Sequence, residues 1–338
     1  MYSLIRPALF TLDAERSHRA VLAGLVHGAP LTRLLYGRAV PTCPVRVMGL
    51  ELPNPVGLAA GLDKDGRAID GLAGLGFGFL EVGTVTPVAQ PGNTRPRLFR
   101  LPRSGAILNR MGFNNDGVEA LCRRLRASCY RGVLGINIGR NADTPVEQTI
   151  RDYQTGLAAV YALASYVTIN ISSPNTQGLR DMQGGAALDE LLGQLIRSRD
   201  NLHEQHGRRV PLAVKIAPDL DDAALAAIAD RLQAHGIDGV IATNTTTARN
   251  NIPERWRNEA GGLSGRPLGA RSTEVIRYLH DCLQGTLPII GVGGIDSDAT
   301  ALEKLEAGAS AIQLYSGLIY RGPALVRECV EAIRARRT

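Results

Sequence analysis

Lysine is almost absent from this chain, which holds three lysines, Lys64, Lys215 and Lys304, against 35 arginines. Arginine carries a planar guanidinium that stays protonated, whereas lysine is a compact point charge whose pKa shifts readily on burial. In a chain that uses arginine for nearly all positive charge, a retained lysine indicates a position where a guanidinium cannot serve. Lys64 and Lys215 lie at the ends of two predicted strands and fit this idea. Lys304 is expected on the surface of a helix and needs no such role.

Other scarcities exclude whole classes of protein. The five cysteines are odd in number and form no CxxC pair, so we expect free thiols rather than disulfides, a zinc site or an iron–sulfur cluster. Aromatic residues make up 4% and the arginines are dispersed, so despite a net charge of +6 we expect no nucleic-acid binding. No apolar run approaches the ~20 residues that span a bilayer, and the N-terminus lacks a signal-peptide pattern. We expect a soluble or peripheral protein.

Eight short apolar runs alternate with helix-length segments from residue 54 onward. Each run is nearly continuous in apolar residues, as in parallel strands buried on both faces. Eight βα units in order predict the α/β class and a closed (β/α)8 TIM barrel. Helical patterns such as Asp219–His235 and Asp296–Ala307 lie between the runs. The predicted strands are Pro55–Ala60, Gly78–Val85, Gly132–Ile138, Tyr166–Ile171, Leu212–Ala217, Gly239–Thr243, Pro288–Val292 and Ala311–Tyr315.

Residues 1–40 stand apart from this alternation. Asp13 can cap a helix that runs to about His27, and Leu31–Tyr36 begins a second short helix. We therefore expect a two-helix extension over residues 1–40 and a barrel over residues 41–338. The extension is basic with an apolar face, which suits a membrane interface. The alternative is a cap packed over the floor of the barrel.

Polar residues or glycines follow nearly every predicted strand. Because the active site of such a barrel lies at the carboxyl ends of its strands, these residues should converge on one rim. Turn capping by Asn and Ser is the alternative for any one motif taken alone. The residues at the strand exits are Lys64, Thr84, Asn137, Asn170 with Ser173, Lys215, Thr243 with Asn244, Gly293-Gly294 and Tyr315-Ser316.

Glycine-rich segments at this rim predict a phosphate site. Gly291-Val-Gly-Gly294 follows the seventh strand, Tyr315-Ser-Gly317 follows the eighth, and Gly261–Pro267 forms a third such loop. Glycines let backbone N–H groups reach phosphate oxygens. Phosphate-binding barrels include isomerases, aldolases and flavoenzymes, so the reaction class stays open here. No GxGxxG or P-loop stretch occurs.

The rim offers no histidine and no metal-ligand spacing, so we expect no metal site. Ser173, in Asn170-Ile-Ser-Ser-Pro-Asn175, is a candidate base. A serine is a weak base unless the substrate carbon is acidic and its electrons have a sink. A bound flavin would be such a sink, and Lys215 near its pyrimidine end would stabilise the reduced anion.

Six segments together resemble dihydroorotate dehydrogenase, over essentially the whole chain. Ser173 stands where the soluble class of that family carries cysteine, and with the helical extension this is similar to the quinone-linked class 2. The segments are Asn54–Lys64, Asn109–Phe113, Asn170–Asn175, Ala213–Ala217, Ala242–Thr245 and Ile290–Gly294.

The resemblance implies oxidation of (S)-dihydroorotate to orotate in de novo pyrimidine (UMP) biosynthesis. FMN would accept the hydride from C6 while Ser173 removes the C5 proton, and Lys64 and Lys215 would be the other catalytic residues. Ubiquinone or menaquinone would be the final acceptor, with His18 and Arg100 near its head group. The implied FMN ligands are Ala60, Gly61, Lys64, Thr84, Asn137, Asn170, Lys215, Thr243, Gly265, Gly294, Tyr315 and Ser316. The implied substrate ligands are Lys64, Asn109, Arg110, Met111, Gly112, Phe113, Asn170, Asn175, Asn244 and Thr245.

The resemblance also implies a peripheral protein on the cytoplasmic side of the inner membrane, expected as a monomer. Three other hypotheses compete with it. One is a soluble relative that uses fumarate or a nicotinamide cofactor. A second is a Schiff-base aldolase with Lys215 as the nucleophile. A third is a membrane-associated scaffold without catalysis.

Overall fold

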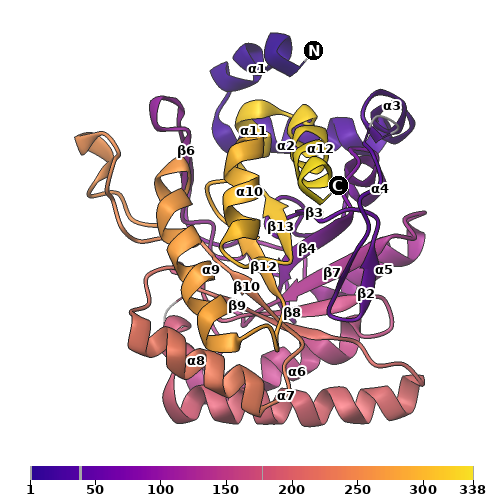
Figure 1. The fold of residues 1–338 in the computed structure, drawn as a ribbon, viewed down its shortest axis with the longest axis vertical. Coiled ribbons are helices and arrows are strands. Elements are labelled where there is room, and N and C mark those ends of the chain that lie inside the picture. Colours follow the sequence, from indigo (N-terminus) through magenta and orange to yellow (C-terminus); the bar gives the residue numbers. More distant parts are fainter. Residues whose placement is uncertain (1, 38–39, 177, 338) are drawn as a thin grey trace.

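A closed barrel of eight parallel strands forms the centre of the molecule (Figure 1). The computed structural model describes residues 2–37, 40–176 and 178–337. The strands follow one another around the barrel in the order β10-β12-β13-β3-β4-β7-β8-β9, and the eight predicted strands are confirmed. Their bounds are β3 (Val56–Leu58), β4 (Phe79–Val85), β7 (Val133–Ile138), β8 (Tyr166–Asn170), β9 (Leu212–Ile216), β10 (Gly239–Ala242), β12 (Ile289–Val292) and β13 (Ala311–Leu314).

Helices surround the barrel, and most of them bury one apolar face. In α8 (Asp222–Ala234) the buried residues Leu225, Ile228, Ala229 and Leu232 follow helical spacing, and the Asp221 side chain caps its start. The other helices of this shell are α4 (Ile69–Ala73), α5 (Val118–Ala127), α6 (Thr149–Val160), α7 (Gly185–His206), α9 (Gly269–Leu283), α10 (Asp298–Glu306), α11 (Ser316–Arg321) and α12 (Ala324–Arg337).

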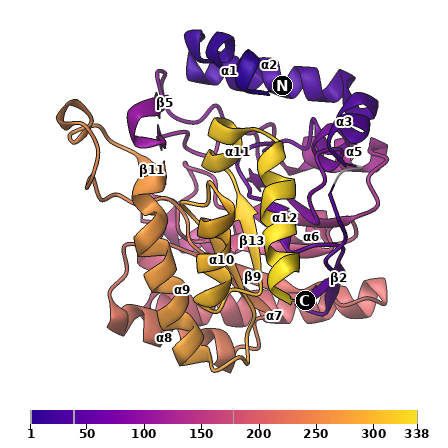
Figure 2. The ribbon, with the colours of Figure 1, turned by 45° about the horizontal axis from the view of Figure 1, so that its top comes forward.

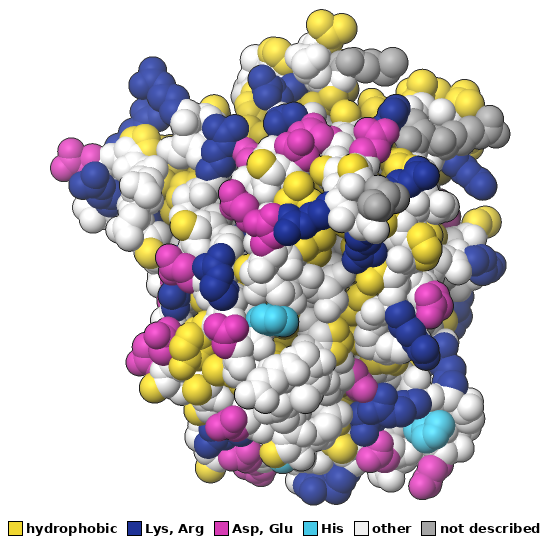
Figure 3. All heavy atoms as spheres, in the orientation of Figure 1, with side chains coloured by type: hydrophobic (Ala, Val, Ile, Leu, Met, Phe, Trp, Pro, Cys, Tyr) yellow, Lys and Arg dark blue, Asp and Glu magenta, His cyan; other side chains and the backbone are white. Residues whose placement is uncertain are grey.

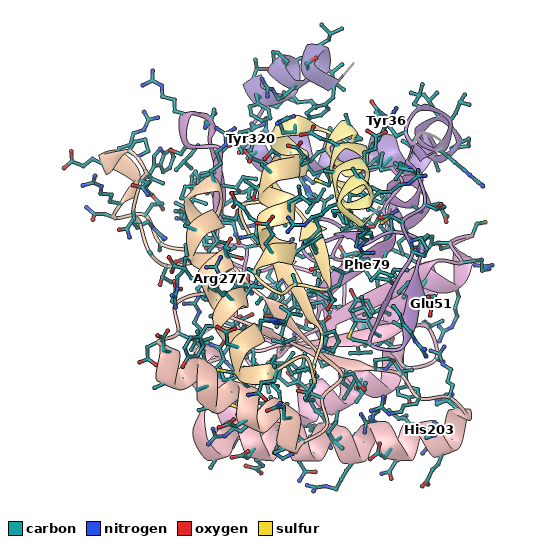
Figure 4. The ribbon with its side chains drawn as sticks, viewed as in Figure 1. Tyr36, Glu51, Phe79, His203, Arg277 and Tyr320 are labelled. Carbon is teal, nitrogen blue, oxygen red and sulfur yellow. The ribbon has the colours of Figure 1, made fainter. Side chains whose placement is uncertain are left out.

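A hairpin closes the floor of the barrel, at the amino ends of the strands. Strands β1 (Val45–Val47) and β2 (Leu50–Leu52) pair antiparallel. Val47 and Leu52 of the hairpin pack in one buried cluster with Phe79 and Tyr166, the first residues of β4 and β8. Figure 4 labels Phe79 in this interior position. The alternative that residues 1–40 cap the floor is therefore wrong.

A three-stranded antiparallel sheet, which the sequence did not predict, lies at the other end. It consists of β5 (Leu98–Leu101), β6 (Ala106–Asn109) and β11 (Gly262–Gly265), in the order β11-β6-β5. Its strands are short, and residues far apart in the chain pair in it, such as Ala106 with Gly265. Local sequence patterns carry no signal of such pairing.

The N-terminal helices form a layer across the end of the molecule next to α11 (Figure 2). The predicted helices are confirmed as α2 (Ala14–His27), capped by Asp13, and α3 (Ala29–Leu35). A further helix, α1 (Tyr2–Thr11), precedes them and contains Pro7. Tyr2 donates a hydrogen bond to the carbonyl of Ile319 in α11. Among the helices of the described residues, none is long and apolar enough to cross a membrane.

Lys304 is buried, so the expectation of a surface lysine is wrong. It lies on α10 with 1% of its surface exposed, and its ammonium donates to the carbonyl oxygen of Gly269 and the hydroxyl of Thr273 on α9, at 2.8 and 2.6 Å. Burial lowers the pKa of Lys304 to about 7. The packing of α10 against α9, which no local pattern encodes, turns this side chain inward.

Candidate active site

A cavity opens at the carboxyl ends of the barrel strands, beneath the small sheet. Residues from the exits of the strands line it together with Leu98, Ile107 and Ser264 of the sheet. Of the predicted site residues, the cavity is lined by Ala60, Gly61, Lys64, Thr84, Asn109, Met111, Gly112, Phe113, Asn170, Ser173, Asn175, Lys215, Thr243, Asn244, Thr245, Gly265, Gly294, Tyr315 and Ser316.

Two of the predicted FMN and substrate ligands, Arg110 and Asn137, lie outside this lining. The Arg110 side chain forms an ion pair with Glu259 and donates to the carbonyl of Pro96, away from the cavity. Asn137 lies one layer deeper, where its side-chain oxygen accepts a 2.6 Å hydrogen bond from the Thr84 hydroxyl. Asn137 therefore supports the lining without being part of it.

Ser173 is the candidate base. It is 4% exposed, and its hydroxyl oxygen accepts a 3.2 Å hydrogen bond from the backbone N–H of Asn175 in the loop after β8. Among the described residues that line the cavity there is no Asp, Glu or His. A proton removed inside this cavity therefore has Ser173, the other hydroxyls and the lysines as its possible first acceptors.

Amide side chains hold one another in fixed orientations around the cavity. Asn170 donates to the Thr84 hydroxyl at 2.9 Å, and Asn244 donates to the Ser172 hydroxyl at the same distance. Asn175 faces Asn109, with 3.4 Å between the amide nitrogen and oxygen. Amides of fixed orientation offer paired donors and acceptors, which suit a planar ligand edge.

Both rim lysines are held in poorly solvated positions. Burial lowers the pKa of Lys64 to about 8, an effect that the nearby Asp65 carboxylate opposes, and its ammonium donates to the carbonyl of Gly61. Lys215 is 5% exposed, and burial lowers its pKa too. Within the described part of the chain, the Lys215 ammonium has no hydrogen-bond partner, although it lines the cavity. A buried ammonium without a partner calls for an acceptor from a ligand.

Glycines form one wall of the cavity, where the backbone conformation excludes other residues. Gly294 has φ 74°, and a Cβ there would collide with the Cα of Gly269. Gly265 has φ 91°, and a Cβ there would collide with the carbonyl oxygen of Gly105. Ser316 closes this wall by donating to the Ser264 hydroxyl at 2.8 Å. Bare backbone of this kind suits close approach of a phosphate, so the glycine wall and the unpartnered Lys215 fit a flavin that carries a phosphate.

A second, mainly apolar cavity lies between the N-terminal helices and the rim. His18 and Arg100 both line it, and Leu98, Ile107 and Tyr315 line both cavities and form their common wall. Burial, followed by the charge of Lys64, lowers the pKa of His18 to about 4, so its imidazole is neutral at pH 7. The Arg100 guanidinium lies over the ring of Phe10, 4.6 Å from its centroid.

Glu81 and Gln313 were missed by sequence reasoning. Both point into the barrel interior, and Gln313 also lines the first cavity. Each stands in a strand that otherwise reads as apolar. A charged or amide residue within such a strand is the signal that could have identified them, since a buried polar group needs partners.

Comparisons with known proteins agree with one another over nearly the whole chain. A family model described as dihydroorotate dehydrogenase matches residues 43–336. A protein named dihydroorotate dehydrogenase (quinone) from Thiobacillus denitrificans is 60% identical, with 98% of this chain and 99% of that protein covered. Its counterpart in Methylococcus capsulatus is 57% identical, with 98% of each covered.

Solved structures agree. The crystal structure of DHODH from Eimeria tenella in complex with ferulenol is 37% identical, covers 97% of this chain and 93% of that chain, and has a TM-score of 0.88. The relatives' similarity extends from the barrel through the N-terminal helices. The chain therefore belongs to the dihydroorotate dehydrogenase family.

Proposed function

We propose that this protein oxidises (S)-dihydroorotate to orotate, with FMN as the hydride acceptor and a membrane quinone as the final electron acceptor, in de novo pyrimidine biosynthesis. One observation carries the proposal. A single cavity combines a buried serine, two lysines, four asparagines and a glycine wall, and three side chains separate it from an apolar cavity under exposed helices. Family membership leaves the aldolase and scaffold hypotheses without support, and the relatives' names favour a quinone over fumarate or nicotinamide.

Two features support the proposed cofactor site: the glycine wall, and the Lys215 ammonium, which has no hydrogen-bond partner among the described residues. The glycine wall at Gly265 and Gly294 would hold the phosphate, and Lys215 would donate to a flavin ring acceptor. FMN, when bound, supplies the acceptor for the substrate's hydride. The proposed FMN contacts are Ala60, Gly61, Lys64, Thr84, Asn170, Lys215, Thr243, Gly265, Gly294, Tyr315 and Ser316, with Asn137 supporting Thr84 from beneath.

The amide groups and Lys64 would bind the substrate. Dihydroorotate carries a carboxylate and a cyclic ureide edge. An ammonium suits the first, and oriented amides suit the second. The proposed contacts are Lys64, Asn109, Met111, Gly112, Phe113, Asn170, Asn175, Asn244 and Thr245.

Ser173 would remove the proton at C5 of the substrate. Burial shields its hydroxyl from bulk water, and the lysines supply the positive potential that favours negative charge on the substrate during the transfer. The lack of an acid or imidazole in the described lining directs this role to Ser173.

The N-terminal helices would deliver the quinone and hold the protein on the membrane surface. The second cavity is lined mainly by apolar side chains, and His18 and Arg100 are among its polar residues. Large apolar side chains stand exposed on the outside of these helices, among them Leu4 at 82% and Leu34 at 58%, and hydrophobic atoms are visible at that end in Figure 3. We place this attachment on the cytoplasmic side of the inner membrane, with residues 1–40 as the docking unit of a monomer.

An anaerobic absorbance spectrum of the purified protein tests the proposal. A flavin band near ~450 nm should bleach on addition of dihydroorotate and return on addition of a quinone. A band that never bleaches would remove the substrate. Well-folded protein that lacks flavin and cannot be reconstituted with FMN would remove the cofactor.

A further inference from the structure

A polar layer crosses the barrel interior directly beneath the candidate active site. Five strands contribute one side chain each, and none of the five is more than 5% exposed. An apolar floor lies below this layer and the cavity lies above it. Polar groups in a barrel interior cost free energy unless they are paired. The members are Glu81 of β4, Asn137 of β7, Tyr166 of β8, Lys215 of β9 and Gln313 of β13.

Glu81 is the centre of this layer. Its carboxylate accepts hydrogen bonds from Asn137 at 2.8 Å, from the Tyr166 hydroxyl at 2.9 Å and from Gln313 at 2.7 Å. All three donors are neutral. Burial and the neighbouring carboxylate raise the pKa of Tyr166 well above its usual value, which keeps its phenol a donor. Three donors satisfy the carboxylate, yet they bring no positive charge.

An oriented chain of amides runs from Glu81 to the rim. Because the Asn137 nitrogen donates to Glu81, its oxygen faces upward and accepts from the amide of Asn170 at 3.2 Å. The oxygen of Asn170 in turn accepts from the Ser172 hydroxyl at 3.0 Å and from the amide of Asn244 at 3.4 Å. The carboxylate thus determines whether each amide side chain presents its nitrogen or its oxygen toward the cavity.

Lys215 supplies the opposite charge. It is the ladder partner of Asn170, so it enters the interior beside this amide chain. Burial lowers the pKa of Lys215, and among the described residues Glu81 is the charged group that raises it. Other ionisable groups of the described residues around the cavity and the layer include Lys64 after β3, Tyr166 on β8 and Tyr315 after β13. Burial raises the pKa of Tyr315 to about 12, so it stays neutral.

We propose that Glu81 is a positioning residue of the active site: its carboxylate fixes the direction of the Asn137–Asn170 amide chain and is the negative charge of the layer that contains Lys215. The inference rests on the proposed flavin and dihydroorotate sites. Without the carboxylate, Lys215 would lose its proton at a lower pH and would then face the flavin as a neutral amine. The alkaline decline in the rate of flavin reduction would therefore begin at a lower pH.

Two substitutions separate charge from geometry. Glu81→Asp keeps the charge and displaces it, whereas Glu81→Gln keeps the length and removes the charge. In anaerobic stopped-flow with the holoenzymes, the alkaline limb of flavin bleaching by dihydroorotate should shift downward by about one pH unit or more in Glu81→Gln. Glu81→Asp should bleach more slowly with the limb in its wild-type position. Tyr166→Phe, which removes a neutral donor from Glu81, should also leave the limb in place.

Unmoved limbs in all three variants would overturn the proposal and leave Glu81 a structural residue. The limb should not report Lys64 instead, because the largest charge effects on the pKa of Lys64 come from Asp65, Arg97, Glu15 and Asp63 rather than from Glu81. Bleaching of the wild-type protein in the same series tests the proposed function separately.

A second measurement holds even if Glu81→Gln folds poorly. Denaturant unfolding of Glu81→Gln, Lys215→Met and the double variant forms a double-mutant cycle. If the two charges compensate each other, the double variant should lose less stability than the two single losses added together, because each single variant leaves one buried charge uncompensated. All proteins of the cycle are compared with the same fraction of bound flavin. Additive losses would overturn the pairing.

Discussion

The barrel buries its apolar side chains, whereas the N-terminal helices leave many of theirs exposed. In the barrel, residues such as Leu58, Leu80 and Ile136 are completely buried. Helices α1 and α3 bury no residue at all, and α2 buries only Glu15 and Ser17. Of the ten exposed large hydrophobic side chains of the described residues, eight lie before residue 36.

From this contrast we expect the two regions to meet different environments. The barrel has inner and outer apolar cores, whereas the N-terminal helices expose apolar residues that would be better buried. A patch of that kind marks a binding or membrane surface. The comparison predicts that the two regions fail differently when mutated: damage at the rim should stop chemistry, and damage to the helices should stop delivery of the quinone.

Ser173→Ala should have the largest effect, on the barrel side of the comparison. Loss of a general base typically slows a reaction by about 100-fold or more, so bleaching of the flavin by dihydroorotate should slow by that factor. Flavin content and thermal midpoint should not change, because the Ser173 oxygen accepts one local hydrogen bond. Ser173→Cys keeps a group that can take a proton and should recover part of the rate. Bleaching near the wild-type rate in Ser173→Ala would remove Ser173 from the mechanism.

Glutamates on the exposed helices should produce the opposite pattern. A leucine buried in an apolar phase contributes about 1.5–3 kcal/mol. Leu4→Glu combined with Leu34→Glu should therefore weaken binding to phospholipid vesicles by about 10-fold or more. Turnover with a membrane quinone should fall with it, while bleaching by dihydroorotate stays constant. Flotation assays and both half-reactions measure this.

Val146→Glu is the matched control for these leucines. Val146 is 57% exposed but lies on the barrel surface, far along the chain from the helices. Vesicle binding of this variant should equal that of the wild type. If Val146→Glu weakens binding as much as the leucine pair, the helices are not the docking surface.

Lys304 offers the smallest effect and a test of the barrel's packing. Its folded pKa of about 7 lies below the unfolded value of 10.5. Between these values the unfolded chain holds a proton that the folded protein has lost, so the free energy of unfolding rises with pH. One such proton contributes up to about 1.4 kcal/mol per pH unit. Lys304→Met should have a shallower rise from about pH 7.5 to about pH 9.5, measured by urea unfolding. Equal slopes would mean that Lys304 is protonated to the same extent in both states.

The sequence predicted those features that local patterns encode. Apolar runs identified all eight barrel strands, and most of the residues predicted at the strand exits line the cavity. The β5–β6–β11 sheet was missed because Ala106 pairs with Gly265 across the chain. Lys304 and Glu81 were misjudged or missed for a related reason. Whether an isolated charged residue is buried depends on helices and strands that only the tertiary structure brings beside it.

Helix α11 has a consequence for communication along the molecule. Its first residue, Ser316, lines the rim cavity, and its later carbonyls, at Ile319 and Tyr320, accept from Tyr2 and Arg6 of α1. A helix of six residues is about 9 Å long. One short helix therefore connects the cavity wall to the residues that hold α1. A ligand bound in the rim cavity should slow amide hydrogen exchange in α1, so exchange in α1 should report whether the cavity is occupied.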